Sequence, residues 1–302
     1  MASPLQSRSI TFQAYTLWLF NKSDLKTVLL PQSLFAFSSA FTGGFSGNVP
    51  PDNQVLPASM IKSMFWIWVA LLVQSIANQR LPNSVVEDSL NKPWRPLPAK
   101  RITRQQADHI LHFVLPFVAI YSLYVGSFKE LATLVIFIWI YNDLGGADQS
   151  VLYRNVLNAF GLMSFSSGVT AITAGSDWIS QSTQAPLWVA VTGLIIASTV
   201  HAQDLEDMEG DIARGRKTVP LIYGENIARG TLAVAVTFWS IYCPAFWNLG
   251  FIGFLPTTLL GFSAAFRTLS FRTQISDQRT WALICVWYGV IYLLPVVHAL
   301  LN

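Results

Sequence analysis

The sequence has little charge and almost no cysteine. Only 12% of its 302 residues are charged and 52% are hydrophobic, whereas a soluble domain has about 25% charged residues. So much apolar surface cannot be buried in one soluble core, so a lipid bilayer is the expected environment. The only cysteines, Cys243 and Cys285, lie in apolar stretches. We therefore expect two small buried side chains rather than a disulfide or a metal pair.

The N-terminal region lacks the pattern of a cleavable signal peptide. It contains Arg8 and has no long apolar run before Leu17, so the first membrane span is expected to direct insertion. Nothing in the charge pattern indicates a nucleic-acid partner or an obligate protein partner.

Long hydrophobic runs, separated by glycine and proline, predict an all-α membrane protein. A spanning helix needs roughly 20 mostly apolar residues, and nine segments fit this description, the fourth of them short. They are residues 27–46, 58–79, 106–127, 129–142, 154–174, 185–203, 226–245, 248–266 and 280–300.

The positive charges agree with nine spans. With this count, 17 of the 19 Lys and Arg residues fall on the side of the N-terminus, and only Lys62 and Lys129 fall on the other side. Because cytoplasmic loops carry an excess of Lys and Arg, the richer side is predicted to be cytoplasmic. The two long polar loops, after the second and sixth spans, both lie on this side.

The loop after the sixth span contains an acidic pattern. It reads HAQDLEDMEGDIARGRKTVP from His201 to Pro220, and three aspartates follow the spacing i, i+3, i+7. They are Asp204, Asp207 and Asp211. This spacing places them on one face of a helix, where they repel one another unless a cation lies between them. Mg²⁺ prefers oxygen ligands of this kind together with substrate phosphate, so the pattern predicts a Mg²⁺ site. A solvated helix end of mixed charge is the alternative.

The loop after the second span, from Ala77 to Thr103, carries a looser set of polar residues. Asn78 closes the span, and Glu87 and Asp88 follow. Because Pro82 interrupts any continuous helix between them, a turn must bring Asn78 towards the two acids if they share one site. The alternative is that Glu87 and Asp88 only pair with nearby basic residues.

Both loops also carry basic side chains that can neutralise phosphate oxygens. They are Lys92 and Arg95 in the first loop, and Arg214, Arg216 and Lys217 in the second. Acidic residues beside basic ones are what a bound Mg²⁺–diphosphate pair requires.

At these residues the sequence resembles the UbiA superfamily of intramembrane prenyltransferases and related terpene cyclases. NKPWRPLP, from Asn91 to Pro98, resembles the first cytoplasmic signature of the family. DLEDMEGD, from Asp204 to Asp211, and GRKTVP, from Gly215 to Pro220, resemble the second. The order of spans and loops extends the resemblance over nearly the whole chain.

The resemblance implies one all-helical domain over residues 1–302, with nine membrane helices around a central cavity that opens towards lipid. Family members hold Mg²⁺ and a prenyl diphosphate at two aspartate-rich sites at the cytoplasmic end and ionise the diphosphate to an allylic cation. Transferases attach this cation to an acceptor, often an aromatic one, whereas cyclases fold it onto its own double bonds.

The second family motif is intact and the first is not. The three aspartates match the second motif position by position, and Arg95, Arg216 and Lys217 match the basic residues of the two signatures. In the first motif, Asn78 is followed by Gln79 instead of aspartate. The resemblance therefore implies substitutes: Asn78, Glu87 and Asp88 as metal ligands, and Tyr141 and Arg154 in place of a Tyr and a Lys that follow the fourth span.

The altered first motif resembles the divergent fungal branch, which includes cyclases that form sesquiterpenes and diterpenes. We therefore predict a Mg²⁺-dependent terpene cyclase acting on farnesyl or geranylgeranyl diphosphate, in the endoplasmic reticulum or a similar membrane. A prenyltransferase is the alternative. An isoprenoid-binding or transport protein is more remote, because the charges gather at one face and not at the midplane.

Aromatic faces stabilise positive charge, and the sequence offers many aromatic residues for a cavity, although ordinary packing or lipid contact is the alternative for each. Examples are Phe35, Phe37, Phe41, Trp66, Trp68, Phe113, Phe160 and Phe165.

Overall fold

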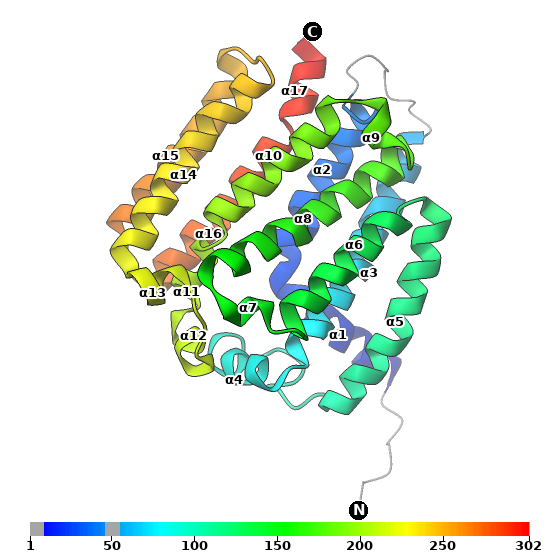
Figure 1. Ribbon diagram of the computed structural model, residues 1–302, viewed down its shortest axis with the longest axis vertical. Helices are drawn as coiled ribbons and strands as arrows, with labels where there is room; N and C mark the ends of the chain where they lie inside the picture. Colours follow the sequence, from blue (N-terminus) through cyan, green and yellow to red (C-terminus); the bar gives the residue numbers. More distant parts are fainter. Residues whose placement is uncertain (1–8, 46–54, 302) are drawn as a thin grey trace, which may run out of the picture.

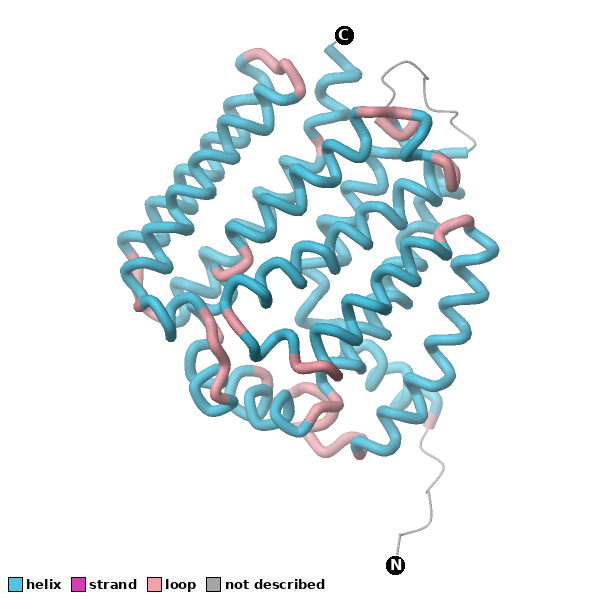
Figure 2. The backbone as a smooth tube through the Cα atoms, viewed as in Figure 1, coloured by secondary structure: helices cyan, strands magenta, loops and turns pink. Residues whose placement is uncertain are grey.

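The computed structural model describes residues 9–45 and 55–301, and within these ranges the regular structure is helical throughout (Figures 1 and 2). Arg8 and the end of the first predicted span, residue 46, lie outside the described residues. The long helices are α2 (Leu30–Phe41, preceded by the π-helix η2, Leu25–Leu29), α3 (Val55–Gln79), α5 (Arg104–Val125), α6 (Phe128–Asn142), α8 (Val151–Ala174), α10 (Gln184–Thr199), α14 (Glu225–Phe246), α15 (Phe251–Ser270) and α16 (Gln274–Tyr292).

Each of the nine predicted spans has one of these helices at its place in the chain. In the described ranges, six helical stretches are long and apolar enough to cross a membrane: Leu56–Gln79, Arg104–Val125, Val151–Ala174, Gln184–Glu206, Phe251–Ser270 and Gln274–Leu301. The chain is therefore a multi-pass membrane protein. The helices α2, α6 and α14 are not among the six, so the count of nine spans stays a prediction.

Short helices gather at one end of the bundle, at the bottom of Figure 1. They are α1 (Ile10–Asn21), α4 (Pro82–Asn91), α7 (Gly146–Gln149), α11 (Ala202–Glu206), α12 (Met208–Arg214) and α13 (Val219–Tyr223). At the opposite end lie α9 (Trp178–Gln181) and α17 (Leu294–Leu301). The two polar loops of the sequence thus meet at one end of the molecule, as predicted.

Local sequence explains the helix boundaries next to these loops. Helix α3 ends at Gln79 and α4 begins at Pro82, whose fixed φ suits the first turn of a helix, so the predicted interruption is confirmed. Helix α5 begins at a capping box between Thr103 and Gln106. It ends at Gly126, whose φ of 82° favours glycine.

Large apolar side chains point both inward and outward. Trp66 is fully buried against Gly168, where an added Cβ would lie 2.2 Å from the indole. On outer helices, Phe113 of α5 is 79% exposed and Leu259 of α15 is 63% exposed. Exposed apolar surface of this extent on long helices is what contact with lipid requires.

Candidate active site

The acidic loop forms two short helices and not one. Helix α11 ends at Glu206, α12 begins at Met208, and Asp207 between them has φ −100° and ψ 7°. The prediction that three aspartates share the face of one helix is therefore wrong. All three are nevertheless buried, namely Asp204, Asp207 and Asp211.

The break at Asp207 lets the second loop pack on the first. The Asn91 side chain of α4 donates through Nδ2 to the backbone carbonyl of Asp207 at 2.9 Å and accepts from the amide of Gly210 at 3.1 Å. The second bond also satisfies the Gly210 amide, one of those that the first turn of a helix leaves without a helical partner. The two signature motifs are thus parts of one structure.

Gly210 allows this close approach. A Cβ at residue 210 would lie 2.3 Å from Nδ2 of Asn91 and 2.7 Å from the backbone carbonyl of Glu87. We expect Gly210→Ala to push α12 away from α4, to lower the melting temperature in detergent by a few degrees and to lower turnover by about tenfold or more. Gly230→Ala is the matched control, because nothing lies within 4 Å of its added Cβ. Equal melting curves and rates for the two variants would contradict this account of the interface.

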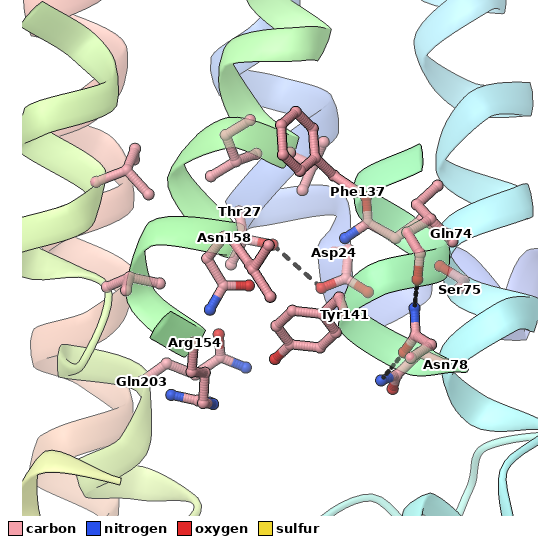
Figure 3. A pocket seen from close by; sticks show the side chains of 18 of the residues that line it. Asp24, Thr27, Gln74, Ser75, Asn78, Phe137, Tyr141, Arg154, Asn158 and Gln203 are labelled. Carbon is pink, nitrogen blue, oxygen red and sulfur yellow. Dashed lines mark hydrogen bonds between the residues drawn. The ribbon is translucent and has the colours of Figure 1, made fainter. Parts of the chain in front are cut away.

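A cavity of about 160 Å³ opens beside these loops, between α3, α6, α8 and α11 (Figure 3). Eight of the residues predicted from the sequence line it: Asn78, Glu87, Lys92, Arg95, Tyr141, Arg154, Asp207 and Arg216. Five predicted residues do not line it: Asp88, Asp204, Asp211, Arg214 and Lys217. Lys217 is exposed and donates to the backbone carbonyl of Gln149, so its predicted place in the diphosphate site is not supported.

Acidic and basic side chains are paired around this cavity. Lys92 Nζ lies 2.7 Å from Asp207 Oδ2, and Arg154 Nη1 lies 2.8 Å from Asp204 Oδ1. Glu87 Oε2 is shared between Arg214 at 3.0 Å and Arg216 at 3.1 Å. A dianionic ligand could take the place of the acids as partner of the basic side chains, and a cation could take the place of the bases as partner of the acidic ones. Each side chain already carries the charge that this requires.

The two neighbouring acids of the first loop differ. Glu87 lines the cavity, whereas Asp88 is buried behind it and accepts from Arg95 Nη1 at 2.7 Å. Burial raises the pKa of Asp88, and the Arg95 guanidinium opposes this rise. Arg95 is itself anchored through Nη2 to the Ser23 hydroxyl at 2.7 Å. The alternative that the acids of this loop only pair with nearby basic residues therefore describes Asp88, which positions Arg95.

Asn78 contributes a neutral polar group from α3. Its Nδ2 donates to Asn142 Oδ1 of α6 at 2.9 Å, and both residues line the cavity. Asn78 and Glu87, on either side of the turn at Pro82, thus line the same cavity.

Sequence reasoning missed several cavity residues. Polar ones are Asp24, Gln74, Asn158 and Gln203, and aromatic ones are Phe137, Trp281 and Tyr288. None of the eight aromatic candidates from the sequence lines the cavity. Phe35 and Phe165 are fully buried between helices. Gln203 belongs to the acidic loop already quoted, directly before Asp204, but the others lie outside the two motifs, so only the fold identifies them.

The residues present fit a Mg²⁺ ion. Among residues 9–45 and 55–301, no three His, Cys, Asp or Glu side chains already form a ligand set. However, both carboxylate oxygens of Asp211 are buried without a hydrogen-bond partner, and the Nε atom of its ion-pair partner Arg216 is 3.9 Å from Oδ1. A buried carboxylate in this state needs a counter-ion, and oxygen-only donors are those that Mg²⁺ prefers.

The same carboxylate predicts a pH-dependent response to Mg²⁺. Burial, followed by the charge of Asp204, raises the pKa of Asp211 from 3.8 to about 7. The folded protein then binds this proton more tightly than the unfolded chain does, so stability without Mg²⁺ should fall as the pH rises from about 4 to 7. Mg²⁺ requires the ionised form, so its affinity should rise about tenfold per pH unit up to pH 7.

Thermal melting in detergent checks this expectation, with and without Mg²⁺ at pH 6 and pH 8. We expect the larger Mg²⁺-induced rise in melting temperature at pH 8, and no such difference in Asp211→Asn. An equal rise at both pH values in the wild-type protein would contradict it.

Known proteins resemble this chain over most of its length. The profile described as the UbiA prenyltransferase family matches residues 63–290. The fumagillin beta-trans-bergamotene synthase of Aspergillus fumigatus is 31% identical over 91% of this chain and 88% of its own length. The somaliensene A/B synthase of Streptomyces somaliensis is 27% identical over 93% of this chain and 92% of its own length.

Among solved structures, a UbiA homolog from Archaeoglobus fulgidus bound to GPP and Mg²⁺ aligns with a TM-score of 0.61. The alignment covers 93% of this chain and 99% of that chain at 13% identity. At this identity the likeness shows the fold, which is therefore of the same kind.

Proposed function

Because the chain belongs to the UbiA prenyltransferase family, we propose that it is an intramembrane Mg²⁺-dependent terpene cyclase. In this proposal it ionises a prenyl diphosphate and closes the carbocation on its own double bonds. One observation carries the proposal: a single cavity is lined both by paired acidic and basic side chains and by four aromatic side chains. The first feature suits a diphosphate with its metal, and the second suits a cationic hydrocarbon.

The basic side chains of the cavity hold the diphosphate. Lys92, Arg154 and Arg216 supply the donors, and Arg95 adds a fourth positive charge at the cavity wall. The guanidinium groups bind phosphate oxygens in forks, which fixes the orientation of the leaving group. By neutralising the departing charge, these residues lower the barrier to breaking the carbon–oxygen bond.

The acidic side chains hold Mg²⁺. We assign as the oxygen donors Asp207, Glu87 and Asn78, which line the cavity. Asp204 and Asp211 join them from just behind the lining, where they are buried next to Arg154 and Arg216. When bound, Mg²⁺ neutralises charge on the leaving diphosphate. Asp88 is not assigned to the metal. It positions Arg95 through an ion pair.

The remaining wall shields the cation from water, which would convert it to an alcohol. Aliphatic members are Leu134, Ile138, Leu157, Ile196 and Val200. The aromatic members are Phe137, Tyr141, Trp281 and Tyr288. Trp281 and Tyr288 form an edge-to-face pair with ring centroids 6.1 Å apart, and the Tyr288 hydroxyl is fixed by the Thr199 hydroxyl at 2.7 Å.

The indole of Trp281 should steer the cation after ionisation. We expect Trp281→Leu to lower the share of cyclic product about tenfold, because a desolvated cation loses an aromatic face, while Trp281→Phe keeps most of it. Gas chromatography of the organic extract measures this share. Trp139→Leu is the control, because Trp139 of α6 is 54% exposed on the outside of the bundle. An unchanged product pattern in Trp281→Leu would remove this residue from the proposed mechanism.

The cyclase is preferred to a transferase because two relatives that match nearly the whole chain are named as terpene synthases. The family description itself keeps the transferase as second candidate. Product analysis separates them: purified protein is incubated with Mg²⁺ and geranyl, farnesyl or geranylgeranyl diphosphate, without an acceptor. A cyclic terpene that disappears with EDTA supports the cyclase. Turnover only after an aromatic acceptor is added overturns it.

We further propose that the polar end faces the cytoplasm. The excess of Lys and Arg on this side supports the orientation, and an endomembrane such as the endoplasmic reticulum is the proposed location in a eukaryotic cell. A cysteine introduced at exposed Glu209 should react with a membrane-impermeant maleimide only from the cytoplasmic side. Labelling from the opposite side would reverse the orientation.

A further inference from the structure

We propose that Asp24 is the base that ends the reaction by accepting a proton from the cyclised cation. This proposal rests on the proposed cyclase function. A carbon–hydrogen bond next to the cationic centre breaks, and its electron pair forms a carbon–carbon double bond. The proton goes to a carboxylate oxygen of Asp24 and later passes to water. No oxidant, reductant or further reactant is needed.

Asp24 occupies the cavity wall beside the first helix of the bundle. It ends the short 3₁₀-helix η1 (Lys22–Asp24) and precedes the π-helix η2. It is one of the residues that line the cavity, and its side chain is only 26% exposed. Figure 3 shows it between the elements that carry Arg154 and Asn78, with Thr27 directed towards it. The carboxylate therefore borders the cavity in which the proposed function places the substrate.

Hydrogen bonding leaves Asp24 more available as a base than the other cavity carboxylates. Asp207 accepts from Lys92 at 2.7 and 2.9 Å, and Glu87 accepts from two arginines. Both are also assigned to the metal. Asp24 instead accepts from neutral hydroxyls, Ser23 at 3.2 Å and Thr27 at 3.3 Å. Neutral donors weaken the basicity of a carboxylate less than direct bonds from cations do.

The nearest cation to Asp24 is already engaged elsewhere. Arg95 Nη2 lies 4.0 Å from Asp24 Oδ2, but it donates to Ser23, and Nη1 donates to Asp88. Arg95 therefore lies beside Asp24 without donating a hydrogen bond to its carboxylate.

The backbone at this point supports a functional interpretation. A 3₁₀ turn followed directly by a π-helix joins α1 to α2, and such irregularities are frequent at functional sites. Non-helical backbone at the membrane is tolerated where it lines a cavity. The irregular turn presents both Asp24 and Thr27 to the cavity.

The test compares wild-type protein with Asp24→Asn, using Mg²⁺ and the prenyl diphosphate that the wild-type protein converts. Two readouts are taken: diphosphate release and the structures of the products. We expect diphosphate release within about threefold of the wild type, because Asn keeps the shape and a carbonyl acceptor for Thr27. The wild-type olefin should fall about tenfold in share, replaced by alcohols from water or by olefins that lose a different proton. Asp24→Glu should restore part of the wild-type olefin.

Asp108→Asn is the control for loss of a negative charge, because Asp108 pairs with Arg80 at 3.3 Å and does not line the cavity. An unchanged olefin pattern in Asp24→Asn overturns the proposal and leaves the diphosphate as the base. Loss of diphosphate release in Asp24→Asn also overturns it, because the residue would then act in ionisation. Absence of diphosphate release in the wild-type protein instead refutes the proposed function.

Discussion

Asp211→Asn is expected to lower Mg²⁺-dependent diphosphate release by about 10³-fold. The substitution keeps the volume of the side chain and removes one charge. Both Asp211 oxygens are buried without a hydrogen-bond partner, so the substitution removes no side-chain hydrogen bond. What it removes is the charge that attracts Mg²⁺. The rate is measured by coupled detection of released diphosphate at saturating Mg²⁺.

Glu209→Gln is the matched control for Asp211→Asn. Both residues belong to α12, but Glu209 is exposed and Asp211 is 1% exposed. The control should keep the wild-type rate, and both variants should melt within a few degrees of the wild type. A wild-type rate in Asp211→Asn would remove the second loop from the metal site.

Glu87→Gln and Asp88→Asn are expected to separate the two neighbouring acids of α4. Glu87 lines the cavity and faces Arg214 and Arg216, so its neutral variant should lose about 10²-fold or more in rate. Asp88 does not line the cavity and acts on the site through its ion pair with Arg95. Its neutral variant should therefore lose about tenfold or less in rate. Steady-state rates with Mg²⁺ measure both effects.

A titration of Mg²⁺ adds a second readout for this pair. In Glu87→Gln the concentration of Mg²⁺ for half-maximal rate should rise, whereas in Asp88→Asn the KM for the prenyl diphosphate should rise because Arg95 loses its ion pair with Asp88. If Asp88→Asn shows the larger loss and the changed Mg²⁺ requirement, the assignment of Glu87 is wrong.

The sequence was sufficient to predict the positions of the long helices and most of the residues that line the polar end of the cavity. Hydrophobic runs of about 20 residues can only be buried as membrane helices, so the helices fall where they were expected. The position of Pro82 correctly predicted the turn that brings Asn78 and Glu87 to one cavity. These features depend on local sequence, which is why a single chain reveals them.

Features that depend on contacts between distant segments could not be predicted. The spacing of Asp204, Asp207 and Asp211 suggested one helix, but the packing of Gly210 on Asn91 goes with a break at Asp207. Glu87 and Asp88 are adjacent in the chain, and only the contacts of α4 with α12 and with Arg95 show which of them faces the cavity.

Asp24 and Trp281 were missed for the same reason. Asp24 is a single acid ahead of the first long helix, and Trp281 is one of 11 tryptophans. They border one cavity although the chain separates them almost from end to end. Composition makes aromatic candidates plentiful in a membrane protein, so it does not distinguish cavity residues from lipid-facing ones.

The central claim is that the paired charges at the polar end bind and ionise a prenyl diphosphate. The most direct measurement is the release of diphosphate from farnesyl or geranylgeranyl diphosphate by the purified wild-type protein, without acceptor, with Mg²⁺ and then with EDTA. We predict release that requires Mg²⁺, is accompanied by a cyclic terpene and is lost in Asp211→Asn. Mg²⁺-dependent binding of these substrates without any release of diphosphate would contradict the account.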